Sequence, residues 1–256
     1  MKKYNKIFMS ILGFSLCFLY RGKALYAAPE DTLIPSFPYI DTINKPTDMA
    51  LVLQIVLLLT IISLAPAIIV MLTSFTRTII VLSFVRNGIG VQQVPPTQVL
   101  IGLALFMTIF IMAPVWGEIN EQAFQPYINQ EISINEALQN AQIPLRDFMF
   151  RQTREKDLAL FVHHARLNSA INTPSDVPTY VLIPSFIISE IKTAFQMGFI
   201  IYIPFLVIDM IVSSTLMSMG MLMLPPVMIS LPFKILLFLL VDGWNLVINS
   251  ILVGFK

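Results

Sequence analysis

The feature that most constrains this chain is a run of 24 residues, from Met49 to Leu72, that contains no charged side chain. An α-helix rises about 1.5 Å per residue, so this run is long enough to cross the hydrocarbon core of a bilayer, which is about 30 Å thick. Pro66 lies inside the run and predicts a kink rather than an end, because neighbouring helices can satisfy the carbonyl that proline leaves without a donor. The chain is therefore expected to cross a membrane.

The composition agrees with this expectation and excludes some other functions. Hydrophobic residues make up 56% of the chain and charged residues 12%, which is about half the charged fraction of a soluble protein. The formal net charge is +1, and binding to nucleic acid rests on clustered cationic side chains, so we expect no nucleic-acid partner. The single cysteine, Cys17, excludes an internal disulfide and a paired-thiol site.

The amino terminus has the order of a secretory signal peptide. Three lysines precede an apolar run at residues 7–20, and small residues follow around Ala27. We predict that residues 1–28 are a leader that is cleaved, with a retained anchor as the alternative. Residues 29–48 are then an exported lead-in, whose composition argues against a packed core of its own.

A second uncharged run, Thr97–Trp116, predicts a second helix that ends near its carboxyl-terminal proline and tryptophan. The connection at 73–96 contains Arg77 and Arg86 and no acidic residue, which is typical of a loop that stays in the cytoplasm. Residues 49–116 are therefore predicted to form a first hydrophobic helical hairpin with a cytoplasmic-side loop. The two arginines either contact cytoplasmic partners or only set the topology.

Residues 117–178 form the polar part of the chain. Thirteen of the thirty-one charged residues fall between Glu118 and Asp176. Amphipathic patterns at 132–142 and 144–167 predict helices. If the preceding loop is cytoplasmic, this segment lies on the outer side, so we expect a small periplasmic helical domain.

The last part, residues 179–256, is apolar but carries ionisable residues and prolines within its long runs. These ionisable residues are Glu190, Lys192, Asp209, Lys234 and Asp242. Each would cost roughly 2.5 to 3.5 kcal/mol in lipid, so they should face protein, water or one another. The sequence favours all-α, proline-broken helical hairpins in an obligate oligomer, with these charges at subunit interfaces or buried. The alternative is that they lie at helix ends and extend to the membrane interface.

Glu190 and Lys192 are two positions apart, so they do not face each other on one helix. Each is expected to pair with another element or another subunit. A cation and a carboxylate that meet across such an interface offset part of each other's desolvation, and removing one leaves the other unpaired.

Methionine recurs at every second position just before a double proline. The four residues are Met217, Met219, Met221 and Met223. The prolines that follow favour a bent or extended loop over 217–223, and in an extended segment the four side chains would point one way. Thioethers are flexible, so a ring of them from several subunits would seal a pore and still deform around a passing chain. The alternative is that these methionines fill gaps in a core.

The sequence does not point to catalysis, and we expect no catalytic residue, metal site or cofactor. His163 and His164 are adjacent, so on a helix they diverge by about 100° and are expected to be exposed rather than to share a metal. Asp209 and Asp242 lack the pattern of flanking glycines that we would look for in an intramembrane aspartyl protease, and there is no phosphate-binding glycine loop.

Two long stretches of the chain carry a resemblance to a known family. They are residues 73–115, TSFTRTIIVLSFVRNGIGVQQVPPTQVLIGLALFMTIFIMAPV, and residues 182–244, LIPSFIISEIKTAFQMGFIIYIPFLVIDMIVSSTLMSMGMLMLPPVMISLPFKILLFLLVDGW. They resemble the FliP family of flagellar and virulence secretion systems. The resemblance implies a pore-forming core subunit of the flagellar type III protein export gate, in the bacterial inner membrane and flagellar basal body. It also implies a helical cone held largely above the lipid plane, and a gasket formed by the four methionines.

The same resemblance implies partners. Five copies would assemble with FliQ and FliR, dock to FlhB and FlhA, and conduct unfolded flagellar export substrates. The alternative is a self-contained membrane solute transporter, but such a protein should show internally related halves, which this sequence lacks. A membrane enzyme is a third class, and the sequence offers it no cluster of nucleophile, acid and base.

Overall fold

The computed structural model describes residues 46–91, 94–167, 173, 176–221 and 224–255. The predicted leader at 1–28, all but the last three residues of the lead-in at 29–48, and Met223 lie outside the described residues. The described part of the chain is helical and contains no strand. The prediction of an all-α membrane protein is confirmed.

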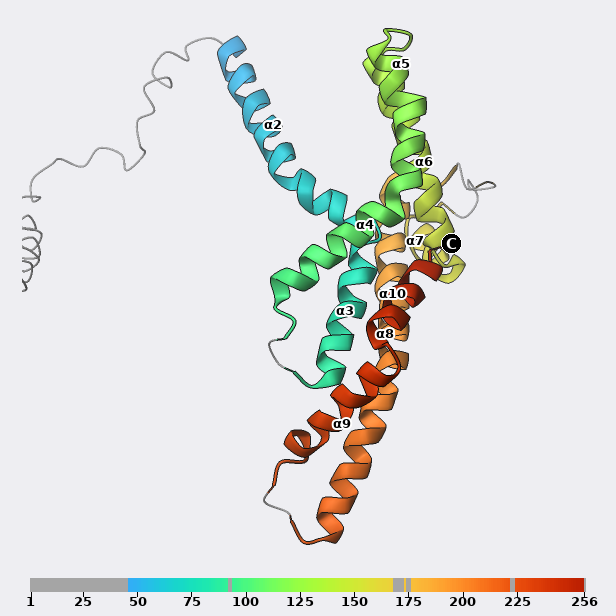
Figure 1. Cartoon of the computed structure of the whole chain (residues 1–256). Coiled ribbons are helices and arrows are strands. Elements are labelled where there is room, and N and C mark those ends of the chain that lie inside the picture. Colours follow the sequence, from blue (N-terminus) through green and yellow to red (C-terminus); the bar gives the residue numbers. More distant parts are fainter. Residues whose placement is uncertain (1–45, 92–93, 168–172, 174–175, 222–223, 256) are drawn as a thin grey trace, which may run out of the picture. The chain divides into compact units, whose positions relative to one another are not determined.

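The described residues form a succession of helices (Figure 1). They are α2 (Pro46–Met71), α3 (Phe75–Ile89), α4 (Thr97–Ile119), the π-helical segment η1 (Asn120–Phe124), α5 (Gln125–Ile128), α6 (Ile134–Gln152), α7 (Glu155–His164), α8 (Thr179–Ser218), α9 (Pro226–Leu240) and α10 (Gly243–Val253). Residues up to Leu58 and residues from Leu59 onward form two compact units. The packing described below belongs to the second unit.

Three stretches of helix are long and apolar enough to cross a membrane: Met49–Ile68, Thr97–Ile128 and Thr179–Ser218. The pair α9 and α10 passes the same criteria only when both helices are taken together, and it is bent by 62° between them. The chain therefore has the helices of a multi-pass membrane protein.

One prediction about the first hairpin was wrong. The segment at 73–96 is not mainly a loop, because α3 occupies most of it and buries apolar side chains such as Val81 and Leu82. Gly90, in a left-handed conformation with φ of 86°, ends that helix. The second helix runs close to its predicted bounds: α4 begins at Thr97, passes Pro114 and ends at Ile119, three residues after Trp116. The chain then stays helical through η1 and α5.

The described residues of the polar segment contain the end of α4, η1, α5 and the two longer helices α6 and α7. Ser133 begins α6 with a capping box, in which its hydroxyl accepts from the amide of Glu136 and the Glu136 carboxylate accepts from the amide of Ser133. The backbone is extended at Thr153 and Arg154, and α7 follows. His163 and His164, at the end of α7, are both exposed, as predicted.

Two clusters of buried side chains hold the second unit together. The α3 cluster consists of Val81, Leu82, Val85, Ile89, Leu100, Ala104, Met107, Ala194, Phe205, Phe238, Val247 and Ile251. The α6 cluster consists of Met112, Val115, Phe148, Met149, Val177, Val181, Leu182 and Phe186. The long helix α8 contributes to both clusters, with α3 alongside it and α9 folded back against its second half (Figure 1).

Two glycines allow α3 and α8 to approach closely. A Cβ added at Gly198 of α8 would lie 2.5 Å from the Phe84 ring of α3, and one added at Gly88 of α3 would lie 2.6 Å from the Phe205 ring of α8. Each helix therefore presents a glycine to an aromatic ring of the other. The Phe84 ring is further held by an edge-to-face contact with Phe195, with centroids 5.2 Å apart.

This contact predicts opposite outcomes for two substitutions of glycine by alanine. Gly198→Ala should destabilise the chain by about 1 to 3 kcal/mol, because the new methyl group overlaps the Phe84 ring. Gly102→Ala, in α4 with open space around it, should be neutral or stabilise by up to about 1 kcal/mol. Denaturant unfolding in detergent measures both, and equal effects would contradict the proposed close packing.

Candidate functional site

The ionisable residues of the apolar helix α8 all find partners on other helices of the same chain. Glu190 pairs with Arg77 of α3, Lys192 with Asp157 of α7, and Asp209 with Lys234 of α9. Within the described residues these are the ion pairs, and one member of each lies on α8. The residues singled out in the sequence thus connect α8 to three neighbours.

Arg77 is the most highly connected of these residues. Its guanidinium is buried and forms a two-pronged pair with Glu190: Nε donates to Oε2 at 3.0 Å, and Nη2 donates to Oε1. Nη2 also donates to Oε1 of Gln152, the last residue of α6, at 2.9 Å. Nη1 donates to the carbonyl oxygen of Gly254 at 2.8 Å, and the Phe255 ring lies 3.9 Å from the guanidinium carbon. Arg77 was predicted in a cytoplasmic-side loop; instead it joins four segments of the fold.

The second pair fixes α7 on α8. Asp157 is buried, and its carboxylate accepts from Lys192 Nζ and, at 2.9 Å, from the hydroxyl of Ser189. Burial of the Asp157 carboxyl raises its pKa, but the hydrogen bonds from Lys192 and Ser189 and the nearby positive charges lower the pKa by more, so the net shift is downward. The neighbouring Arg154 donates from its amide to the same Ser189 hydroxyl at 3.0 Å. Asp157 was not predicted as a site residue.

The third pair joins α8 to α9 beyond the α3 cluster. Lys234 is buried and donates to Asp209 Oδ2 at 2.6 Å, while the hydroxyl of Ser230, one turn earlier on α9, donates to Oδ1 at 2.6 Å. Both oxygens of the Asp209 carboxylate are therefore bound to α9. This pair closes the α8–α9 hairpin.

Two of the predicted site residues lie elsewhere. Asp242 is not buried within this chain: it is exposed in the turn between α9 and α10, where its backbone is left-handed with φ of 50°, and its predicted place at a subunit interface stays a prediction. It takes no part in the three ion pairs of the described residues. Arg86, at the end of α3, donates to the Thr97 hydroxyl at 3.0 Å and so bridges to the first residue of α4.

The described methionines of the 217–223 segment lie at the end of α8, where the chain bends, so of the bent or extended loop that the sequence favoured the described residues form the bent one. The amide of Gly220 donates to Met217 O at 3.0 Å and the amide of Met221 donates to Leu216 O at 3.0 Å, which is the Schellman pattern that ends a helix at a left-handed glycine. Met217, Met219 and Met221 are 59%, 70% and 38% exposed. They therefore surround a tight turn and fill no core gap in this chain.

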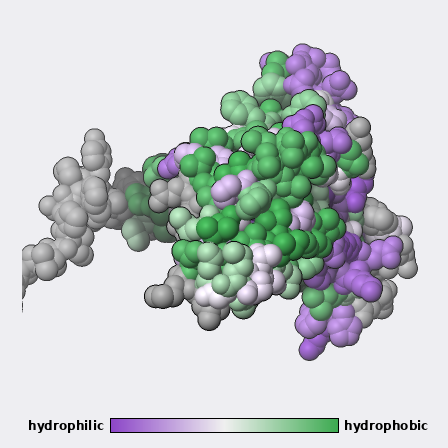
Figure 2. Space-filling view, turned by 60° about the horizontal axis from the view of Figure 1, so that its bottom comes forward, coloured by the Kyte–Doolittle hydropathy of each residue, from purple (hydrophilic) through white to green (hydrophobic). Residues whose placement is uncertain are grey.

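Much of the surface around these elements is apolar. Figure 2, in which the α8–α9 end is turned towards the viewer, shows a broad hydrophobic area with hydrophilic residues gathered at its edge. Phe106 and Phe110 of α4 and Ile200 of α8 are each at least two thirds exposed. Water is a poor solvent for such a surface, so lipid or other protein must cover it.

Comparison with known proteins decides the family. The model of the FliP family matches residues 58–251, which include all three ion pairs and the methionine turn. The chain belongs to the FliP family. It is 54% identical to the flagellar biosynthetic protein FliP of Bacillus subtilis (strain 168) over 212 residues, which are 83% of this chain and 96% of that protein. It is 44% identical to the protein of the same name from Pectobacterium carotovorum subsp. carotovorum over 243 residues, 95% of this chain and 92% of that protein.

The Arg77–Glu190 pair predicts a large loss of stability when one partner is removed. Glu190→Gln should destabilise this FliP-family chain by about 3 to 5 kcal/mol, because it leaves the buried guanidinium without a counter-charge. Glu118→Gln, at an exposed position of α4, is the matched control and should change stability by less than about 0.5 kcal/mol. Thermal unfolding of the purified chain measures both. A loss of stability at Glu190 as small as that of the control would show that the Arg77–Glu190 pair does not stabilise the fold.

The lowered pKa of Asp157 predicts a pH dependence of stability. A carboxyl whose folded pKa lies below its unfolded pKa contributes stability that is complete above the unfolded value, near 3.9, and is lost as the pH falls through the folded value. The difference in melting temperature between the unmodified chain and Asp157→Asn should therefore be constant near neutral pH and shrink below about pH 4. A difference that stays constant down to pH 2 would show that the charge of Asp157 contributes nothing.

Proposed function

We propose that this chain is a pore-forming core subunit of the flagellar type III protein export gate in the bacterial inner membrane. Its relatives are named flagellar biosynthetic proteins, and its helices are those of a multi-pass membrane protein. In this proposal the gate lies in the flagellar basal body, conducts unfolded flagellar export substrates and is needed to assemble the flagellum.

The observation that supports this role most directly is the turn after α8. Three methionine side chains are exposed there, where the chain reverses between α8 and α9. The charged residues of this hairpin, Asp209 and Lys234, are paired with each other. A thioether is apolar enough to exclude ions and flexible enough to move aside for a passing chain. Repeated around an axis by several copies, such turns would make a deformable seal.

The exposed apolar surface supports assembly. We propose a homo-oligomer of five copies, joined by FliQ and FliR and docked to FlhB and FlhA, in which neighbouring subunits cover part of the surface that a single chain leaves open. The ion pairs described above lie within one chain, so they set the shape of each subunit rather than the contacts between subunits. The contacts between subunits then rest on the apolar faces of α4 and α8.

The proposal predicts a leak when the seal is removed. Replacing Met217, Met219, Met221 and Met223 by alanine should leave gates that assemble, as judged by native gel, but that conduct ions and reduce swimming motility. Met228→Ala, at an exposed position of α9 outside the turn, is the matched control and should leave gates tight. If gates with the four substitutions conduct no ions and the cells swim normally, the methionines only pack and do not form a seal. Intact motility after deletion of the gene, with loss of uptake of a solute, would favour a transporter instead.

A further inference from the structure

The helices α9 and α10 are each too short to cross a membrane by themselves. They have 15 and 11 residues, which correspond to about 22 Å and 16 Å, whereas the core of a bilayer is about 30 Å thick. Aligned end to end they would be long enough, but here they are bent by 62°. The angle between them therefore decides whether this part of the chain forms one span or folds back.

The bend is made by two residues. Asp242 adopts φ of 50° and ψ of 55°, a left-handed conformation that L-residues other than glycine, asparagine and aspartate seldom adopt. A Cβ added at the next residue, Gly243, would lie 2.3 Å from the Phe238 ring of α9, so the ring packs directly on the backbone of the turn. The bend is thus well defined, but it depends on a left-handed residue, which a continuous helix would not contain.

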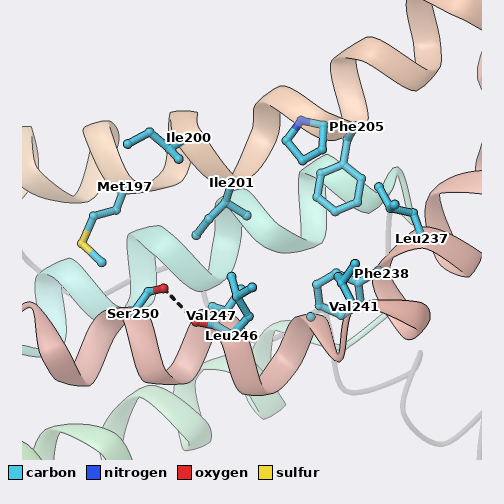
Figure 3. A pocket seen from close by; sticks show the side chains of 12 residues that line it. Met197, Ile200, Ile201, Phe205, Leu237, Phe238, Val241, Leu246, Val247 and Ser250 are labelled. Carbon is cyan, nitrogen blue, oxygen red and sulfur yellow. Dashed lines mark hydrogen bonds between the residues drawn. The ribbon is translucent and has the colours of Figure 1, made fainter.

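The inside of the bend is incompletely filled. A cavity of about 410 Å³ lies between α8, α9 and α10 (Figure 3). Its walls are apolar side chains such as Ile201, Phe238 and Val247, and the one hydroxyl, that of Ser250, donates to Leu246 O within α10 at 2.8 Å. Dispersion contacts are lost across such a space, so α10 is not held tightly against α8 on this side.

What holds the far end of α10 is a polar and aromatic contact. Gly254 O accepts from Arg77 Nη1 at 2.8 Å, and the ring of Phe255 lies over the same guanidinium. The Phe255 ring also stacks on Phe148 of α6, with centroids 6.2 Å apart and planes 17° apart. Phe255 packs against both the α3 cluster and the α6 cluster. We call Gly254 and Phe255, with the Arg77 face that receives them, the latch.

In a membrane, these contacts differ in what can replace them. The apolar face of α10, with Val247 and Ile251, loses little when lipid takes the place of protein, because acyl chains are as apolar as the core. The hydrogen bond and the cation–π contact to Arg77 have no counterpart in lipid. The latch is therefore the interaction that distinguishes the bent arrangement from a straight one.

We propose that the latch is a conformational device: it holds α10 in the bent arrangement, and without it α9 and α10 align into a single membrane-crossing helix. The bent state keeps the residues after α10 against α6, whereas the straight state carries them away from it. This inference rests on the contacts of one chain and is independent of the proposed pore.

Spin labels on α6 and α10 test the latch. Cysteines replace Arg151 and Val253, both exposed, in a chain with Cys17→Ser, and the distance between the labels is measured in lipid nanodiscs diluted with unlabelled chain. An arm of about 16 Å that turns through 62° moves its end by roughly 17 Å. The chain with an intact latch should give one short distance, and Phe255→Ala should add a population longer by about that amount.

Two further variants make the outcome specific. Phe255→Leu keeps an apolar side chain but loses the ring over Arg77, and it should give a smaller long-distance population than Phe255→Ala. Phe195→Ala removes an exposed ring outside the latch and should leave the short distance alone. If Phe255→Ala and Phe255→Leu both keep only the short distance in bilayers, the latch does not set the bend and the inference is overturned.

Discussion

The arrangement of this chain depends on one buried cation. A guanidinium that leaves water loses several kcal/mol of hydration, and it is tolerated only where good geometry and additional hydrogen bonds compensate. Arg77 meets that requirement by drawing partners from α8, from the end of α6 and from the residues after α10. Because its planar fork offers donors in fixed directions, these three segments must stand at fixed positions around α3. Arg77 thus joins the polar helix α6 to the apolar helices α3 and α8.

Much of the architecture could be predicted from sequence, because membrane helices are specified by long runs without charge. The runs at Met49–Leu72 and Thr97–Trp116 and the polar segment after Glu118 correspond to helices α2, α4, α6 and α7. Family membership could also be recognised from two long stretches of sequence. Both kinds of prediction use information that is local or that accumulates over many positions, so single misplaced residues do not spoil them.

The site was less predictable because its contacts are not local. Arg77 and Glu190 are separated by 113 positions, and no sequence pattern around either residue indicates that the other is its partner. Positive charge near an apolar run suggested a loop, although the apolar residues of 75–89 repeat at helical spacing. Asp157 was passed over because a carboxylate in a polar segment is usually solvated, whereas here α8 covers it. The prolines after the methionines favoured a bent or extended loop, but they did not indicate that Gly220, in a left-handed conformation, would make the bend.

The three ion pairs together fix the position of α8 along its own axis. A slide by one helical turn moves a side chain by about 5.4 Å, which is more than the distance over which a hydrogen bond survives. Such a slide would break the contacts to α3, α7 and α9 at once, since each holds one charge of α8. At about 60 Å, α8 is roughly twice as long as the core of a bilayer is thick, so lipid alone cannot set its position. The polar pairs do so, and they leave its remaining apolar surface available to lipid or to other subunits.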